Sequence, residues 1–265
     1  MKAALDPRVR AICEPVLVGN RAVLGPVPGV TLVEIERRDA LAALEAARVA
    51  IEGALAGKYH AVVAAPHSEA AIRAAGVEFD GYPSFVARTC GLPPEDGILM
   101  LCFQHGSREI RIAHVTLHAS VSRALRLITK ERVLSTIRAV HRLFPRIAVS
   151  GLNPHAEGEE EGSVIEPAIS AARAEGIDVD GPIGADTLIQ REGYDAYIVM
   201  LHDQGHVAAK ALAPNRAAAL TIGTPVLFSS VAHGAAFDIA GQARADAAAM
   251  LDAITRLVTR RRRVS

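Results

Sequence analysis

Three apolar stretches of the sequence each run directly into a histidine, reading IAHVTLH to His118, RIAVSGLNPH to His155 and AYIVMLH to His202. Apolar runs of this length, rich in β-branched residues and set among helical patterns, predict buried parallel strands. Because ligands of open α/β sheets bind beyond the carboxyl ends of the strands, the three imidazoles should converge at one sheet edge. A single histidine in such a place is more often packed or solvated. Three in the same position favour a catalytic divalent-metal site.

Between these stretches the sequence alternates strand and helix patterns, which is typical of an α/β fold. EPVLVG, AVVAAP, ALTIG and PVLFSS read as further strands, and helical patterns cover 40–55, 68–76, 130–144, 160–176 and a closing segment from Ala245. Ser68 stands where a helix N-cap belongs. GILMLCFQ and REIRIAHVTLH flank a polar turn at Gly106 and Ser107, which predicts an antiparallel hairpin grafted onto the mostly parallel sheet.

Charge and cysteine content narrow the class of partner. Lys plus Arg and Asp plus Glu each number 29 in the 265 residues, so no strong field favours nucleic acid or an anionic membrane. The three cysteines form no CxxC pair, and no signal peptide or bilayer-length apolar run is present. We therefore expect a cytoplasmic protein acting on a small molecule. No GxGxxG, P-loop or GxSxG motif occurs, so a nicotinamide cofactor must bind in another way.

The richest polar cluster is HDQGH at 202–206, followed by Lys210 on a predicted helix. Asp203 could orient a metal ligand or move a proton, and Lys210 could neutralise substrate charge or protonate a carbanion. The alternatives are a helix cap for Asp203 and a surface charge for Lys210. His233 also follows an apolar run and could contact substrate, bind the metal or pack in a core. Asn153 could likewise bind a cofactor or cap a turn.

GLNPHA, DVDGPIGADT, MLHDQGH with Lys210, and SSVAHGAAFDIAG together resemble the 4-hydroxythreonine-4-phosphate dehydrogenase (PdxA) family, in order and over nearly the whole chain. The resemblance implies two α/β/α lobes around a cleft, similar to isocitrate and isopropylmalate dehydrogenases, assembled as a homodimer. The expected lobes are 1–76 with 235–265, and 77–234, the second carrying the histidines. It also implies that the family's N-terminal strand is missing from this chain.

The same resemblance implies a divalent metal held by His118, His155 and His202, drawn from both subunits. Zinc, cobalt or manganese would suit it, since imidazole ligands favour such metals over magnesium. The implied reaction is NAD(P)-dependent oxidation of a secondary alcohol to a β-keto acid, which then loses carbon dioxide. By the matching motifs, the catalytic side chains would be those of Asp203, Lys210 and Asp186.

Departures from the family pattern concern the substrate. Gly81, Tyr82, Pro83 and Ser84 stand where the phosphohydroxythreonine enzymes carry Gly-His-Thr-Glu, while Ala219 and Phe228 replace an asparagine and an arginine. Hydrogen bonds to a charged group contribute roughly 1.5–3 kcal/mol each, so these losses disfavour a phosphorylated substrate.

Several segments instead resemble the branch of terephthalate dihydrodiol dehydrogenase, whose substrate is a cyclohexadiene cis-diol dicarboxylate. The expected substrate-binding residues are Tyr82, Ser84, Lys210 and His233. Tyr82 and Phe228 would suit a ring, although such aromatic residues are equally often plain packing. Two alternatives stay open: a 4-hydroxythreonine-4-phosphate dehydrogenase of pyridoxal phosphate biosynthesis, and an inactive remnant that binds small molecules.

Overall fold

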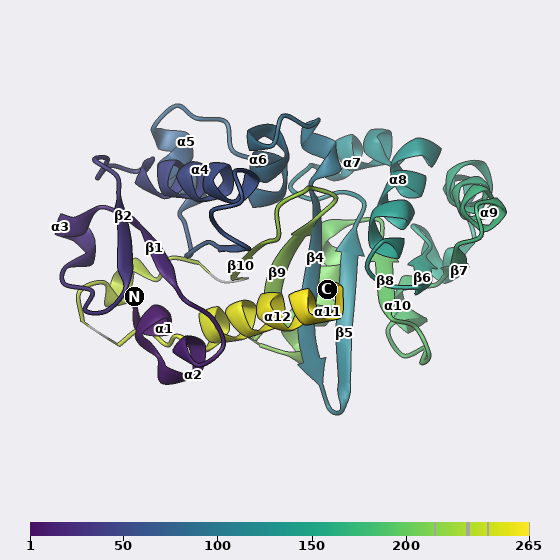
Figure 1. The fold of residues 1–265 in the computed structure, drawn as a ribbon. Coiled ribbons are helices and arrows are strands. Elements are labelled where there is room, and N and C mark those ends of the chain that lie inside the picture. The colour runs from purple at the N-terminus through teal and green to yellow at the C-terminus, as the bar shows by residue number, and fades with distance from the viewer. Residues whose placement is uncertain (215, 232–233, 243, 265) are drawn as a thin grey trace. The chain divides into compact units, whose positions relative to one another are not determined.

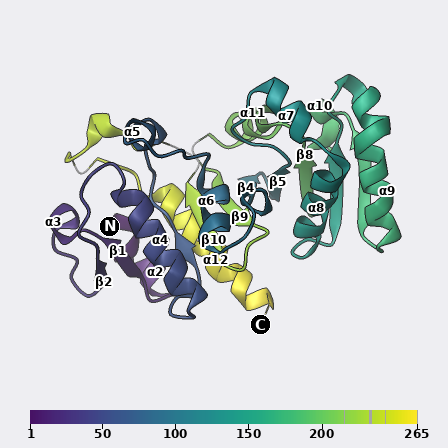
Figure 2. The ribbon, with the colours of Figure 1, turned by 90° about the horizontal axis from the view of Figure 1, so that it is seen from above.

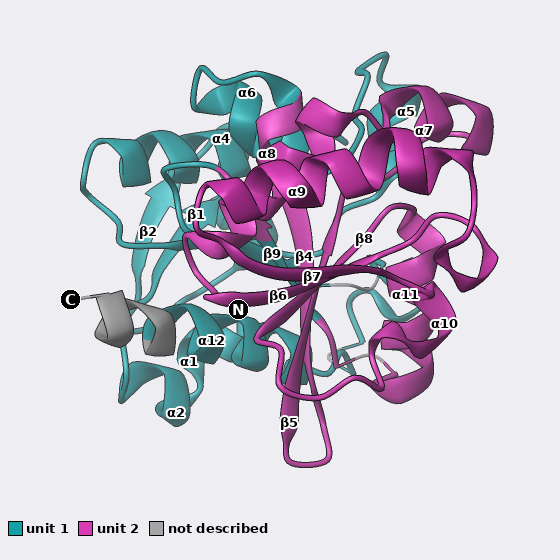
Figure 3. Cartoon of the chain, turned by 90° about the vertical axis from the view of Figure 1, so that its right-hand side faces the viewer, with its two compact units in different colours: residues 1–94, 218–220, 224–265 teal, residues 95–217, 221–223 magenta. Residues whose placement is uncertain are grey.

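The computed structural model describes residues 1–214, 216–231, 234–242 and 244–264 and divides the chain into two compact units. Unit 1 comprises residues 1–94, 218–220 and 224–265, and unit 2 comprises 95–217 and 221–223 (Figure 3). Both units mix helices and strands, as the sequence predicted. Among the described residues, 77–94, 218–220 and 224–231 fall in unit 1, although they were predicted to lie in the second lobe. The arrangement of two lobes around a cleft stays a prediction.

Unit 1 contains two pairs of parallel strands with helices around them (Figure 1). The strands are β1 (Val16–Gly19) with β2 (Thr31–Glu34), and β3 (Val62–Val63) with β10 (Phe228–Val231). The helices are α1 (Lys2–Leu5), α2 (Pro7–Arg10), α3 (Arg21–Leu24), α4 (Ala42–Leu55), α5 (Glu69–Ala74), α6 (Tyr82–Thr89) and α12 (Ala248–Val264), with a 3-10 turn at Phe237–Ile239. The predicted cap is confirmed, since the Ser68 hydroxyl accepts a hydrogen bond from the Ala71 amide at 3.2 Å.

Unit 2 is built on five strands in the order β4-β5-β8-β6-β7. They are β4 (Ile98–His105), β5 (Arg108–His114), β6 (Arg146–Ser150), β7 (Asp178–Ile183) and β8 (Ala196–Val199). β4 and β5 form the predicted antiparallel hairpin, and β5, β8, β6 and β7 run parallel. The residues of β9 (Ala218–Ile222) divide between the two units.

The helices of unit 2 connect these strands, as the alternating pattern predicted. They are α7 (Val121–Leu127), α8 (Lys130–His141), α9 (Glu166–Ala174), α10 (Ala185–Leu188) and α11 (His202–Leu212), with 3-10 turns at Pro94–Asp96 and Pro154–Ala156 and a π-helical turn at Glu161–Ile165. No helix in the part of the chain that the structure describes has the length and apolarity needed to cross a membrane.

The second half of strand β5 is covered on both faces, since Ile112, Ala113 and His114 are all buried. Side chains alternate along a strand, so Ile112 and His114 share one face, where both lie next to Gly205 of α11. Arg111 points the other way and stacks over Phe144, which follows α8. In Figure 2, accordingly, α8 and α11 lie on opposite sides of β5 and β8. The α11 side of the sheet is therefore the side that can carry the HDQGH residues.

Two strands of the structure, β2 and β7, were not predicted from the sequence. β2 reads TLVE and β7 reads DVDGPI, both too polar or too rich in Gly and Pro to be recognised from apolar periodicity. Each lies at one end of its strand order in the structure. Polar and proline residues are tolerated at such edges because one side of the strand makes no ladder hydrogen bonds.

Candidate active site

The carboxyl ends of three strands meet in unit 2. β5 pairs with β8 and β8 with β6, all parallel, so the segments after His114, Val199 and Ser150 leave the same edge of the sheet. Thr116 binds the segment after β5 to the one after β8, because its amide and its hydroxyl both donate to the Met200 carbonyl, at 3.1 and 2.7 Å. The sequence prediction that the three strands end side by side is confirmed.

Four imidazoles gather at this edge. The ring centroids of His118 and His202 lie 5.4 Å apart, those of His202 and His206 are stacked at 3.7 Å, and those of His206 and His114 lie 5.0 Å apart. His114 and His206 were missing from the sequence prediction. His206 could have been found, because side chains four residues apart share a helix face and HDQGH begins α11. For His114 the signal was weaker, since it stands within a strand.

Hydrogen bonds orient the rings of α11. His202 donates from Nδ1 to Oδ1 of Asp203 at 2.6 Å, and His206 donates from Nδ1 to the His202 carbonyl at 3.2 Å. Each ring therefore keeps the lone pair of Nε2 for a ligand. The hydrogen bond from His202 lowers the pKa of Asp203, and the charge of Lys210 adds to this. Burial, followed by the charge of His202, lowers the pKa of His206 to about 4, so its ring is neutral near pH 7.

His114 lies beneath α11. Its side chain is only 1% exposed, and burial, followed by the charge of His206, lowers its pKa to about 3. Nδ1 lies 3.3 Å from the Leu99 carbonyl oxygen, and Nε2 has no hydrogen-bond partner among the described residues. A Cβ atom on Gly205 would come within 2.2 Å of this Nε2. Glycine at 205 is thus required for α11 to lie so close to β5.

His155 lies apart from these four rings. Its backbone and that of Ala156 adopt left-handed conformations, with φ of 59° and 58°, which are uncommon for residues other than glycine. A Cβ atom built on Gly184 would lie 3.6 Å from His155 Cα and 2.9 Å from Asp186 Oδ1. His155 therefore lies beside Asp186, and within the described residues it makes no ring contact with the other histidines. The predicted residues fall into two groups, one around His202 and one around His155.

A buried carboxylate holds the His155 loop. Oε1 of Glu161 accepts hydrogen bonds from the Leu152 and Asn153 amides at 2.6 and 2.8 Å, and Oε2 accepts one from the Asn153 side chain at 2.7 Å. Burial by itself would raise the pKa of Glu161, but these hydrogen bonds outweigh it and lower the pKa. The side-chain nitrogen of Asn153 thus stabilises the loop through its hydrogen bond to Glu161. No sequence signal distinguishes Glu161, because it stands among other acidic residues in AEGEEEGS.

This carboxylate should make the stability of the protein pH-dependent. Because the pKa of Glu161 is lower in the folded state, its contribution is complete above the unfolded pKa and is lost as pH falls through the folded one. We expect Glu161→Gln to reduce the free energy of unfolding near neutral pH by about 1.5–3 kcal/mol. It should also flatten the acid limb of a plot of that energy against pH, measured by urea unfolding.

The exposed Glu159 in the same loop provides the matched control. Glu159→Gln should leave both the free energy of unfolding and its pH dependence as in the wild type. Equal acid sensitivity of the Glu161→Gln variant and the wild type would contradict the assignment.

The donor set at the strand ends suits a metal that prefers nitrogen ligands, since the rings of His202 and His206 keep free Nε2 lone pairs and the His114 nitrogen is orphaned. Nevertheless, no group of three or more His, Cys, Asp or Glu side chains among the described residues is arranged to hold a metal ion. Of the three predicted ligands, His118 and His202 lie together and His155 lies apart from them.

The predicted substrate residues of unit 1 have different environments. Tyr82 is 4% exposed and Phe228 is fully buried, with their ring centroids 5.1 Å apart, and Phe79 packs against Tyr82. Burial raises the pKa of Tyr82. Both rings are core side chains here, which supports the packing alternative. Ser84 is half-buried near the start of α6, and His233 lies outside the described residues. The binding roles of Tyr82, Ser84 and His233 stay predictions.

The comparison with known proteins decides the family. The sequence profile of the family described as "Pyridoxal phosphate biosynthetic protein PdxA" matches residues 11–257. The chain belongs to the PdxA family. It is 41% identical over 236 residues to the 1,2-dihydroxy-3,5-cyclohexadiene-1,4-dicarboxylate dehydrogenase of Comamonas sp., a match that covers 84% of this chain and 74% of that protein.

A second curated PdxA relative is the 4-hydroxythreonine-4-phosphate dehydrogenase of Burkholderia vietnamiensis, 37% identical over 99% of this chain and 86% of that protein. The crystal structure of a 4-hydroxythreonine-4-phosphate dehydrogenase from Burkholderia phymatum superposes with a TM-score of 0.76 at 28% identity and covers 98% of this chain and 92% of that one. The family resemblance and the α/β fold are thereby confirmed. The enzyme class predicted from sequence, a dehydrogenase, is confirmed by these relatives.

Proposed function

We propose that this PdxA protein is a metal-dependent NAD(P) oxidoreductase that oxidises a secondary alcohol of a non-phosphorylated, carboxylated cis-diol and then decarboxylates the β-keto acid. The observation that carries the proposal is the gathering of imidazoles at the ends of β5 and β8 in a chain 41% identical to a cyclohexadiene diol dicarboxylate dehydrogenase. A dehydrogenase acting on an alcohol needs a group that stabilises the developing alkoxide, and imidazole-bound metal serves this purpose.

His118, His155 and His202 would hold the metal, which we expect to be zinc, cobalt or manganese. Because His155 lies apart from the other two rings in one chain, the set would be completed between the subunits of a homodimer. When bound, the metal would polarise the alcohol as a Lewis acid, and the nicotinamide of NAD or NADP would accept the hydride.

The chain's own polar groups would handle protons and charge. Asp203 holds the proton of His202 Nδ1 and thereby directs Nε2 toward a ligand. Lys210, exposed on α11, would neutralise a substrate carboxylate. Once carbon dioxide leaves and the electrons of the broken C–C bond have moved onto the oxygen of the new carbonyl, Lys210 would protonate that enolate oxygen. Asp186 beside His155 would accept the proton of the alcohol. For a cyclohexadiene diol, the product of these steps is an aromatic catechol.

The proposed substrate class rests on the absence of phosphate-binding side chains at the positions where the family carries them. Residues 81–84, which include a core tyrosine and a buried proline, bring no cation, and Phe228 stands in a core where a phosphate-binding family member carries arginine. A dianionic phosphate needs several charge-assisted hydrogen bonds, so their loss favours a carboxylated substrate.

Two alternatives have an observation of their own. The 37% identity to a 4-hydroxythreonine-4-phosphate dehydrogenase over nearly the whole chain favours that activity, which the same strand-end histidines could serve. An inactive protein that binds small molecules is favoured because no three His, Cys, Asp or Glu side chains of the described residues are grouped to hold a metal ion.

The test measures NAD(P)H formation by purified protein with zinc, cobalt or manganese. The terephthalate cis-dihydrodiol and 4-phosphohydroxythreonine are compared in parallel, each with and without a chelator. We expect turnover of the diol that the chelator abolishes. Turnover of the phosphorylated substrate alone would establish the first alternative. Turnover that persists with the chelator would refute the metal dependence. No turnover of either substrate would favour the inactive protein.

A further inference from the structure

Gln204 connects the two segments of unit 2 that carry the proposed metal ligands. Its Oε1 accepts hydrogen bonds from the amides of Met200 and Leu201 at 2.9 and 3.0 Å, just before His202 begins α11. The Leu201 amide, at the N-cap of α11, is a donor that the start of a helix leaves without an intrahelical partner, and Met200 directly precedes it. The side chain therefore fixes the beginning of the helix that carries His202.

The other end of the same carboxamide reaches the His155 loop. Nε2 of Gln204 donates to the Gly151 carbonyl oxygen at 3.1 Å, across 53 residues of sequence. On its other side, the Gly151 amide donates to the Ile183 carbonyl at 2.7 Å, which ties the loop to the end of β7. Gly151 is thus held at both backbone groups, and Gln204 supplies the link toward α11.

The backbone between Gly151 and His155 is closely packed and hydrogen-bonded. Glu161 accepts from the next two amides, and a Cβ atom on Gly151 would lie 2.7 Å from the Ala156 Cα atom and 2.9 Å from Glu161 Oε1. His155 itself is held in an uncommon left-handed conformation, which persists only where its surroundings determine it. A displacement of Gly151 must therefore displace His155.

We propose that Gln204 is a positioning residue that couples the His202 segment to the His155 loop, so that the ligands one chain would contribute to the two metal sites of the homodimer keep a fixed geometry relative to each other. The inference rests on the proposed metal-dependent function. The residue touches neither ligand ring through its carboxamide and acts through the backbone of both segments. Removing residues that orient metal ligands typically weakens metal binding by about 10–100-fold.

The test is Gln204→Glu, which separates the two halves of the carboxamide. A glutamate at this position can still accept from Met200 and Leu201 and suits a helix N-terminus, but it cannot donate to the Gly151 carbonyl. We expect the variant to keep the thermal midpoint of the wild type and to bind Co²⁺ about 10–100-fold more weakly, measured by cobalt absorption on the metal-free protein. Amide hydrogen exchange should rise in 151–156 and stay unchanged in 200–204.

Gln104→Glu is the matched control, because the Gln104 amide also donates to a glycine carbonyl, that of Gly106, at the turn of the β4–β5 hairpin. It should bind Co²⁺ as the wild type does. Wild-type affinity in Gln204→Glu would overturn the inference while leaving the proposed function intact, whereas a wild type that binds no Co²⁺ would overturn the proposed function. If Gln204→Glu does not fold, Gln204→Met replaces it, and failure of both to fold would make Gln204 a purely structural residue and refute the coupling.

Discussion

Replacing His202 by glutamine should reduce kcat/KM of the metal-loaded protein by about 1000-fold or more, equivalent to about 4 kcal/mol of transition-state stabilisation. Glutamine removes the imidazole Nε2, the hydrogen bond to Asp203 and the stacking on His206 at once. Co²⁺ binding to the metal-free protein should be lost in parallel. Steady-state NAD(P)H formation and cobalt absorption measure the two effects, and the circular dichroism spectrum should stay that of the wild type.

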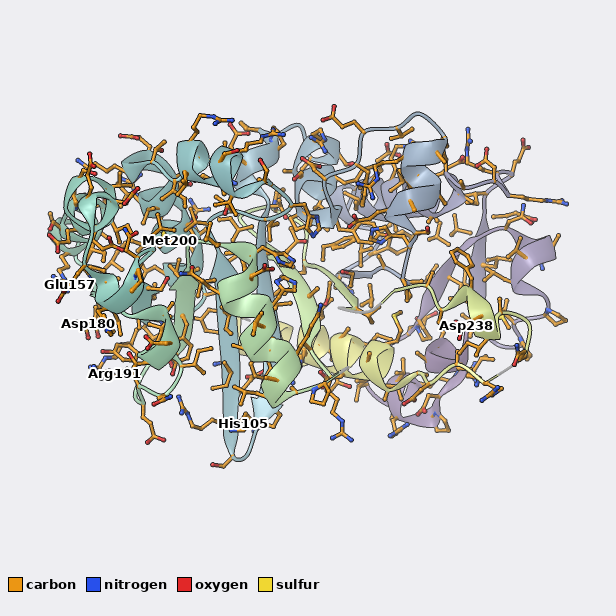
Figure 4. All side chains as sticks on the ribbon, turned by 180° about the vertical axis from the view of Figure 1, so that it is seen from behind. His105, Glu157, Asp180, Arg191, Met200 and Asp238 are labelled. Atoms are coloured by element: carbon orange, nitrogen blue, oxygen red, sulfur yellow. The ribbon has the colours of Figure 1, made fainter. Side chains whose placement is uncertain are left out.

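His105→Gln is the control for this variant. His105 is exposed at the end of β4, beside the hairpin turn, and Figure 4 shows it well away from Met200, which closely precedes His202 in the chain. The His105→Gln variant should retain the activity and the Co²⁺ affinity of the wild type. If His202→Gln keeps turnover that a chelator still abolishes, His202 is not a ligand and the proposed metal set is wrong.

Gly205→Ala should destabilise the protein and weaken metal binding together. In most helices this change would stabilise by up to about 1 kcal/mol, because alanine is the better helix former. Here the new methyl group would lie 2.2 Å from His114 Nε2 and 3.0 Å from Ile112 Cγ2, and both neighbours are fully packed. Such overpacking typically costs about 1–3 kcal/mol, and α11 must move away from β5, taking His202 with it. Urea unfolding and Co²⁺ titration measure the two effects.

A second substitution tests whether the clash is the cause. In the double variant His114→Ala with Gly205→Ala, the ring that obstructs the methyl group is gone, so the loss of stability should be smaller than the sum of the two single losses. Gly162→Ala is the control, since a Cβ atom there meets no other atom within 4 Å. Additive losses in the double variant would show that the packing of His114 under α11 is not the constraint.

Sequence patterns predicted most elements that bury an apolar face. The runs leading to His118, His155 and His202 became β5, β6 and β8, and the apolar spacing before residue 56 became α4. Such patterns are reliable because burial imposes a period of two or 3.6 on the chain. β2 and β7 have no such period, because strands at an edge can be polar or contain proline.

The site was predictable only where residues share a local pattern. His202 and Asp203 are neighbours in the chain, and their hydrogen bond follows from that proximity. By contrast, Gln204 and Gly151 are 53 residues apart, and only the pairing of β8 with β6 brings them together. The same holds for His114 and Gly205, whose contact depends on the packing of α11 on β5.

The class of fold, the strand ends where chemistry is expected and the PdxA family could all be inferred from the amino-acid sequence. Each of these follows from local periodicity or from contiguous motifs, which the chain carries wherever it folds. Which histidines contact one another follows only from the tertiary structure. His206 and His114 lie with His202, and His155 lies beside Asp186. Tyr82 and Phe228 are buried in the core. These outcomes depend on contacts between residues distant in the chain, whose distances are set by strand pairing and helix packing.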